Sequence, residues 1–375
     1  MLDEVKLKSL FLQLLRSAMW KIESDTSLLP ISDPEWQWIY TTAMRHTMQS
    51  VVFDAITSLP EPLRPKGRLM TIWSESVARQ EKAYLGQLRT VNYLYGRFQA
   101  SDITPVVLKG LVLSSCYPYP QHRFSGDIDL FYGSVDRKRE ADDVIEGWGI
   151  HIQRLLNEES IFMLGNVVVE NHGHLFLSYN PLVRTSAKKR LLDVLSSRDA
   201  YCQVDIQGSD ITTLNPTLAL LQLVSHSYKH VINSGIGLRQ MADIALFLSK
   251  ERDRIQRDEF SRWASDWKMI GWTRCLMTAL IHYLGMPDEF SPVESGSMKD
   301  ADTLMEEIWQ TANFGQGDIR FSGTTNSSTR KDTFRRLLHN YRLFARHSYG
   351  EATGALLLLI YNRIKESMHS NKSSC

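Results

Sequence analysis

The sequence predicts an α+β protein in which a small mixed-sheet core lies between two helical regions. Helical periodicity fills residues 1–98 and returns after residue 214, whereas short β-branched runs and turn residues occupy the stretch between them. We therefore expect an N-terminal helical region over 1–98, an α/β core over 99–210 and a C-terminal helical domain over 211–375. A chain of 375 residues with 43% hydrophobic and 23% charged residues is long enough to bury such a core.

The N-terminal region carries clear helix signals. In the stretch SDPEWQWIY, Asp33 can cap a helix and Pro34 suits its first turn. The run LPEPLRPKG, residues 59–67, then interrupts the helical pattern before another long helical segment that ends near Phe98. These signals predict helices on both sides of a proline-rich break.

The middle region alternates strand-like and helical segments. In chain order these are the strand TPVVLKG, the short helix LVLSSCY, the strand SGDIDLFY, the helix DRKREADDVIEGWG, the strand NVVVENHGHLFL and a mixed segment that ends at YCQVDIQG. This order indicates a small α/β unit.

Helical patterns return after Leu214. They cover residues 215–231, 237–250 and 258–285, and two further helices are expected between 300 and 369.

Asp127 and Asp129 lie two positions apart in the strand-like run SGDIDLFY. Successive side chains of a β-strand alternate between its faces, so both carboxylates point the same way and Ile128 points to the opposite face. Two like charges at this spacing repel each other unless a cation lies between them or both lie at a solvated strand end. The pattern therefore leaves a metal site and a solvated pair of aspartates as alternatives.

The order of the elements resembles the nucleotidyltransferase superfamily that includes DNA polymerase beta. In that fold a glycine at the first strand-to-helix turn lets the backbone approach a triphosphate, and the helix N-terminus offers N–H groups to phosphate oxygens. Paired aspartates on the next strand, with a third carboxylate from a later strand, hold two Mg²⁺ ions about 3.5–4 Å apart. The resemblance thus implies an NTP co-substrate and Mg²⁺, with Mn²⁺ as an alternative.

More narrowly, the chain resembles an uncharacterised bacterial nucleotidyltransferase family over roughly residues 35–245. Members carry an LKG turn, an R-x-x-GDIDL strand, an E-x-H strand, and a helix with spaced histidines before GLR. The matching residues here are Leu108-Lys109-Gly110, Arg123 to Leu130, Glu170-Asn171-His172, His226 and His230, and Gly237-Leu238-Arg239. One departure is Leu111, which stands where the wider superfamily usually has serine, so a serine contact to phosphate is missing.

The resemblance implies two sets of site residues. The metal-binding and catalytic carboxylates would be Asp127, Asp129 and Glu170, and the nucleotide-binding residues would be Lys109, Gly110, Arg123 and Gly126. Lys109 or Arg123 would take the role of the missing serine, although both are also explicable as surface charges.

Asp205, in YCQVDIQG, is the alternative third carboxylate. Glu170 is the prediction because it ends the β-branched run NVVVE, where an unpaired ionised glutamate would be costly unless a cation or a donor met it.

Several polar residues of the motifs have no assigned role. His226 and His230 are four apart, which is also the spacing of a zinc-binding helix, but the HExxH glutamate is missing and we favour packing or hydrogen bonding. Arg239 and Asp243 are likewise four apart, so this arginine either pairs with Asp243 or contacts substrate.

Composition narrows the class of protein. The net charge of +1 shows no global signature of nucleic-acid binding, although residues 320–346 hold seven Lys/Arg against one acid. That stretch is either a phosphate-facing surface or a solvated helix face. The four cysteines form no CxxC pair, the N-terminus lacks signal-peptide features, and the most apolar run, GALLLLIY, is too short to span a bilayer. We therefore expect a cytoplasmic protein without a membrane segment.

Together these features predict a metal-dependent nucleotidyltransferase that moves a nucleoside monophosphate from an NTP to an acceptor hydroxyl and releases pyrophosphate. The acceptor would be a small molecule, an RNA 3′ end or a protein side chain. The alternatives are a catalytically inactive binding or regulatory module and a toxin-like enzyme that modifies tRNA. The intact D-x-D argues against the inactive module, because a scaffold has no reason to hold repelling carboxylates together.

Overall fold

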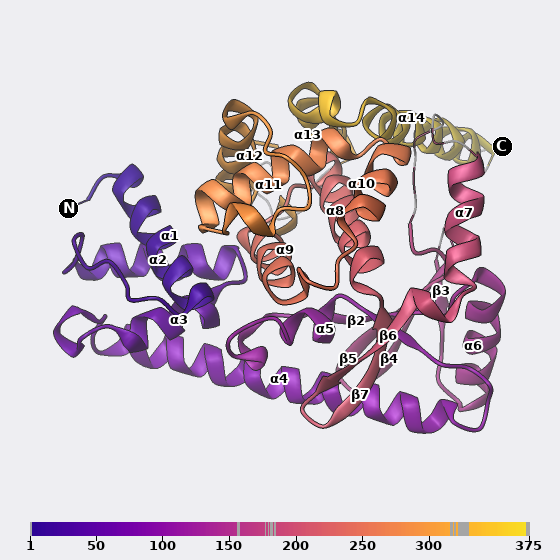
Figure 1. Cartoon of the computed structure of the whole chain (residues 1–375), viewed down its shortest axis with the longest axis horizontal. Coiled ribbons are helices and arrows are strands. Elements are labelled where there is room, and N and C mark those ends of the chain that lie inside the picture. The colour runs from indigo at the N-terminus through magenta and orange to yellow at the C-terminus, as the bar shows by residue number, and fades with distance from the viewer. Residues whose placement is uncertain are drawn as a thin grey trace.

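A computed structural model describes most of the chain (Figure 1). The described residues are 2–155, 158–176, 178, 180, 183, 185–315, 318, 320–321 and 330–372. Among these residues, a mixed five-stranded sheet and a separate two-stranded sheet lie between helical stretches on either side in the chain. The α+β prediction is therefore confirmed. No helix in the described ranges is long and apolar enough to cross a membrane.

The N-terminal stretch is helical as predicted. Its helices are α1 (Glu4–Trp20), α2 (Asp33–Arg45), α3 (Gln49–Ser58) and α4 (Arg68–Phe98). The cap of α2 was assigned wrongly, because Asp33 is already helical and Ser32 is the N-cap. The backbone N–H of Ser32 donates to Glu35 at 2.7 Å, so a glutamate three residues on completes the helix start.

The strands fall between Val106 and Leu214. In chain order the elements are β1 (Val106–Leu108), α5 (Gly110–Ser114), β2 (Asp127–Phe131), α6 (Val135–Gly147), β3 (Gln153–Arg154), β4 (Glu159–Leu164), β5 (Val167–His172), α7 (Thr185–Leu195), β6 (Tyr201–Ile206) and β7 (Ser209–Leu214). The five-stranded sheet has the order β1-β2-β5-β4-β3, in which β2 and β5 are parallel and the other neighbours are antiparallel. The predicted strands TPVVLKG, SGDIDLFY and NVVVENHGHLFL correspond to β1, β2 and β5.

The C-terminal stretch contains α8 (Pro216–Asn233), α9 (Leu238–Glu251), α10 (Arg257–Asp266), α11 (Ile270–Leu284), α12 (Met298–Thr311), α13 (Arg330–Phe344) and α14 (Tyr349–Lys372). The segment 258–285 is divided into α10 and α11, and three helices follow in place of the two expected, because breaks precede both α13 and α14. Helix α1 packs against α11, so the N-terminal helices contact the C-terminal helical stretch.

The alternation of side chains along β2 follows the sequence pattern. Ile128 and Leu130 join one hydrophobic cluster, which also contains residues of α4 and α6. Phe131 joins the other cluster, which contains the C-terminal helices. Asp127 and Asp129 share the face of Phe131, so the two carboxylates point toward the C-terminal helices.

Candidate active site

The predicted carboxylates lie on two neighbouring parallel strands. Asp129 of β2 is directly opposite Glu170 of β5, and Asp127 lies on the same face of the sheet two pairs earlier. Asp205 lies elsewhere, because β6 pairs only with β7 and Asp205 is exposed opposite Asp210. The structure thus brings Glu170, and not the alternative Asp205, beside the D-x-D pair.

His172 is a site residue that sequence reasoning left without a role. Its Nε2 is 2.7 Å from Oδ1 of Asp129, and one ligand atom from each of Asp129, Glu170 and His172 lies within 4.8 Å of the others. Glu170 and His172 are two apart on β5, so the strand alternation that pairs Asp127 with Asp129 also pairs these two, and it could have identified His172. Carboxylate oxygens suit Mg²⁺ and Mn²⁺, whereas an added imidazole is typical of transition-metal sites. The donor set therefore fits a divalent cation.

Lys109 and Gly110 form the turn between β1 and α5. Both have positive φ, +49° and +29°. The positive φ favours glycine at position 110, and a Cβ there would also lie 3.2 Å from Oγ of Ser125, a close contact. Nζ of Lys109 lies 3.2 Å from Oδ2 of Asp129 and 3.3 Å from Nε2 of His226. The predicted phosphate-binding lysine is therefore paired with a predicted metal ligand.

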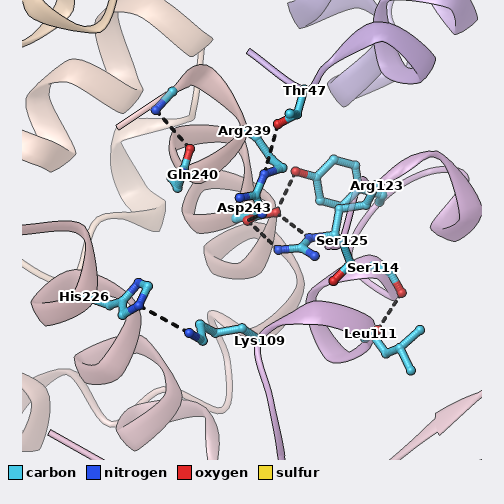
Figure 2. A network of polar contacts seen from close by, with 12 residues as sticks. Thr47, Lys109, Leu111, Ser114, Arg123, Ser125, His226, Arg239, Gln240 and Asp243 are labelled. Atoms are coloured by element: carbon cyan, nitrogen blue, oxygen red, sulfur yellow. Dashed lines mark hydrogen bonds and ion pairs between the residues drawn. The ribbon is translucent and has the colours of Figure 1, made fainter. Parts of the chain in front are cut away.

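Arg123 is not a surface charge. It is buried and donates through Nε and Nη2 to both oxygens of Asp243, at 2.9 and 2.8 Å, while Nη1 of Arg239 lies 3.6 Å from the same carboxylate (Figure 2). The hydroxyl of Tyr117 also donates to Asp243, at 2.7 Å. Arg123 Nη1 is buried and has no hydrogen-bond partner among the described residues. Two arginines share one carboxylate, so the cluster retains one positive charge.

These residues line one cavity of about 400 Å³ between the sheet and the helices α8 and α9. Its walls include all seven predicted site residues, together with His172, His226, His230 and Arg239. This volume falls within the usual range for small-molecule sites, about 300–1,000 Å³. Helix α5 has only five residues, so its N-terminus is a weak anion site and the arginines are the stronger phosphate donors.

The carboxylates of the cavity differ in protonation behaviour. Burial, and next the charge of Asp129, raise the pKa of Asp127. Burial, and next the charges of Asp127 and Asp129, raise the pKa of Glu170. For Asp129 burial acts in the same direction, but Lys109 and His172 outweigh it and lower the pKa. Burial also disfavours the charged form of His172, but hydrogen bonds to Asp129 and Glu159 overcome it and raise the pKa to about 9.

His226 and His230 form a hydrogen-bonded pair beside Lys109. Their Nε2 atoms are 3.1 Å apart. Burial, and next the charge of Lys109, lower the pKa of His230 to about 3 and that of His226 well below its usual value. Both rings are therefore neutral near pH 7. Among the described residues, neither histidine belongs to the group of Asp129, Glu170 and His172 that could hold a metal ion.

Comparisons with known proteins agree with the geometry. A family model described as an uncharacterised nucleotidyltransferase matches residues 32–283, a span that covers more than half of the chain and all the predicted site residues. A solved structure of an antigenic nucleotidyltransferase-like protein from Paracoccidioides brasiliensis is 12% identical over 48% of this chain and 85% of its own length, with a TM-score of 0.31. That likeness is too weak to carry an argument. Among curated proteins, none matches the chain.

Proposed function

The chain belongs to the uncharacterised nucleotidyltransferase family, and from this premise we propose that it transfers a nucleoside monophosphate from an NTP to an acceptor hydroxyl. The observation that carries the proposal is the placement of Asp129 opposite Glu170 on parallel strands, with Asp127 on the same face. The same cavity contains Arg123 and Arg239. Acidic metal ligands and phosphate donors therefore line a single site.

The proposed reaction is a displacement at the α-phosphorus of the NTP. A bond forms between the acceptor oxygen and this phosphorus, and the bond from the phosphorus to the oxygen that bridges the β-phosphate breaks. Pyrophosphate leaves and the hydroxyl proton passes to solvent. Mg²⁺ or Mn²⁺, when bound, would lower the pKa of the hydroxyl and offset phosphate charge.

The site residues would have two roles in this reaction, cation binding and phosphate binding. Asp127, Asp129 and Glu170 would hold the cation, and His172 would join them as a further ligand on losing its proton. Arg239 and the free Nη1 of Arg123 would bind the triphosphate, and Asp243 keeps both guanidinium groups in place. Lys109 would exchange its contact with Asp129 for a phosphate oxygen. An NTP substrate agrees with a cytoplasmic location, which we propose with the activity.

The test is a thermal shift measured with ATP, GTP, CTP and UTP, each with and without Mg²⁺ or Mn²⁺. A rise in melting temperature that requires both nucleotide and cation is expected for at least one NTP. Release of pyrophosphate from that NTP in the presence of cell extract would then show turnover. Asp205→Asn is the matched control, because it removes an exposed strand aspartate outside the cavity.

A second candidate is a module that binds nucleotide without turnover. The observation in its favour is that Lys109 and His172 already neutralise Asp129, so the D-x-D pair can persist in a scaffold without a cation. Nucleotide binding that is independent of divalent cations, with no release of pyrophosphate, would select this candidate.

A further inference from the structure

A second cavity adjoins the one that holds the carboxylates. Lys109, Glu159, His172 and His226 line both cavities. Of these, Lys109 and His226 contact each other (Figure 2). The second cavity has a volume of about 90 Å³ against about 400 Å³ for the first, so it suits a small molecule.

The two cavities share four wall residues and differ in the others. The predicted carboxylates and both arginines line only the first cavity. The second extends from the shared residues to the rings of Phe176, Tyr228 and Trp267. In-line displacement at phosphorus requires the attacking oxygen and the leaving pyrophosphate on opposite sides. Because Arg123 and Arg239 line the first cavity alone, the pyrophosphate is assigned to it and the second cavity is left for the acceptor.

The walls of the second cavity combine apolar rings with balanced charge. Phe176, Tyr228 and Trp267 supply the rings, and the ring centroids of Phe176 and Trp267 are 5.5 Å apart. Trp267 is 6% exposed, and its indole N–H has no hydrogen-bond partner within the ranges that the structure covers.

The carboxylate and ammonium groups of these walls balance in number. Glu159 and Glu351 supply two carboxylates, and Lys109 and Lys229 supply two ammonium groups. A ligand with a net charge gains little from such walls. A ligand with several hydroxyl groups gains more, because hydroxyls donate to carboxylates and accept from ammonium and indole N–H groups, while ring C–H groups pack on aromatic faces.

We propose that the second cavity is the acceptor site of the nucleotidyl transfer, and that the acceptor is a small uncharged polyhydroxy ring compound, such as a monosaccharide or a cyclitol. The inference rests on the proposed function. One hydroxyl of the ring reaches past His172 toward the carboxylates and forms the new bond to the α-phosphorus, and pyrophosphate leaves on the side of Arg239.

An RNA acceptor fits less well. The cavity admits one ring, and described arginines of the basic stretch pair with acids of the chain: Arg320 with Glu307 at 2.9 Å, and Arg346 with Asp300. Neither arginine is therefore an unpaired phosphate donor; residues 316–317, 319 and 322–329 of this region lie outside the described ranges.

The test measures binding without NTP. Saturation-transfer NMR of a library of neutral monosaccharides and cyclitols is compared among the wild type, Glu351→Gln and Trp267→Phe. Glu306→Gln is the matched control, since Glu306 is exposed on α12. At least one compound is expected to bind the wild type and the control, with affinity about tenfold weaker in each cavity variant, as for one lost hydrogen bond. Glu351→Gln keeps the volume of the side chain, so it separates lost binding from lost folding.

Transfer is then followed by mass spectrometry with labelled NTPs, offering the bound compound, its amino and phosphate derivatives, and tRNA. The neutral compound is expected to gain the nucleoside monophosphate on a hydroxyl. The acceptor assignment is overturned if no library compound binds the wild type, if binding survives both cavity variants, or if tRNA or only the charged derivatives are labelled. The proposed function fails separately, through the absence of cation-dependent NTP binding in the wild type.

Discussion

The chain contains two pairs of carboxylates that face each other across neighbouring strands. The two pairs differ in burial and in the groups that they contact. Asp129 and Glu170 lie on the five-stranded sheet, where Asp129 is 5% exposed and contacts Lys109 and His172. Asp205 and Asp210 lie on the two-stranded sheet and are both exposed. Water screens the second pair, whereas the first relies on cations. Cross-strand carboxylates therefore indicate a site only where the fold buries them.

The largest expected difference between the pairs is in activity. We expect Glu170→Gln to lower the cation-dependent release of pyrophosphate by at least about a hundredfold, the scale of losing one group that stabilises transition-state charge. Asp205→Asn should leave the rate unchanged. Initial rates at saturating NTP and Mg²⁺ measure both. If the Asp205 variant lost activity and the Glu170 variant kept it, Asp205 and not Glu170 would be the third carboxylate of the site.

The next difference is in stability. Asp129→Asn leaves the buried charges of Lys109 and His172 without their partner, so we expect the free energy of unfolding to fall by about 3 kcal/mol. Asp127→Asn should not destabilise the protein, because burial and the charge of Asp129 already disfavour ionised Asp127. Urea denaturation at pH 7 without divalent cations measures both. Equal stabilities of the two variants would show that Asp129 is not the neutralised member of the pair.

A smaller effect is expected on nucleotide affinity. Arg239→Gln removes a charge from the cavity while Asp243 keeps both hydrogen bonds from Arg123. Loss of a charge-assisted contact should weaken NTP binding by about 1.5–3 kcal/mol with little change in stability. Calorimetric titration with Mg²⁺ and the NTP found by thermal shift measures this. Arg89→Gln, at an exposed position of α4, is the control. Unchanged affinity would reduce Arg239 to a partner of Asp243.

Local patterns predicted much of this architecture. Strands β2 and β5 follow from alternation and β-branched runs, and the positions of Lys109, Asp127, Asp129 and Glu170 follow from the order of the elements. Strands β4 and β7 were not predicted, because ESIFML and SDITTL acquire strand structure through their partners β5 and β6.

Long-range pairing lies beyond what local patterns can predict. Arg123 pairs with Asp243, which lies 120 residues further along the chain. Spacing along the sequence cannot show a contact of this kind. It could show the pairing of Arg239 with Asp243, four residues apart on α9, and the alternative of such a pair was indeed raised.

The smallest effect concerns the exposed pair itself. Asp205 and Asp210 are directly opposite each other, so their side chains share one face of the two-stranded sheet. The strands are joined by the tight turn at Gln207-Gly208, where Gln207 and Gly208 have positive φ. Like charges directly opposite on a sheet cost roughly 0.2–1 kcal/mol, and salt screens exposed charges. We expect Asp205→Asn to raise the free energy of unfolding by a few tenths of a kcal/mol in low salt, and the gain to vanish near 0.5 M NaCl. Urea denaturation of wild type and variant at two NaCl concentrations measures it. A gain in stability that persisted in high salt would mean that something other than the charge of Asp210 destabilises Asp205. The exposed pair would then not be a suitable comparison for the buried pair.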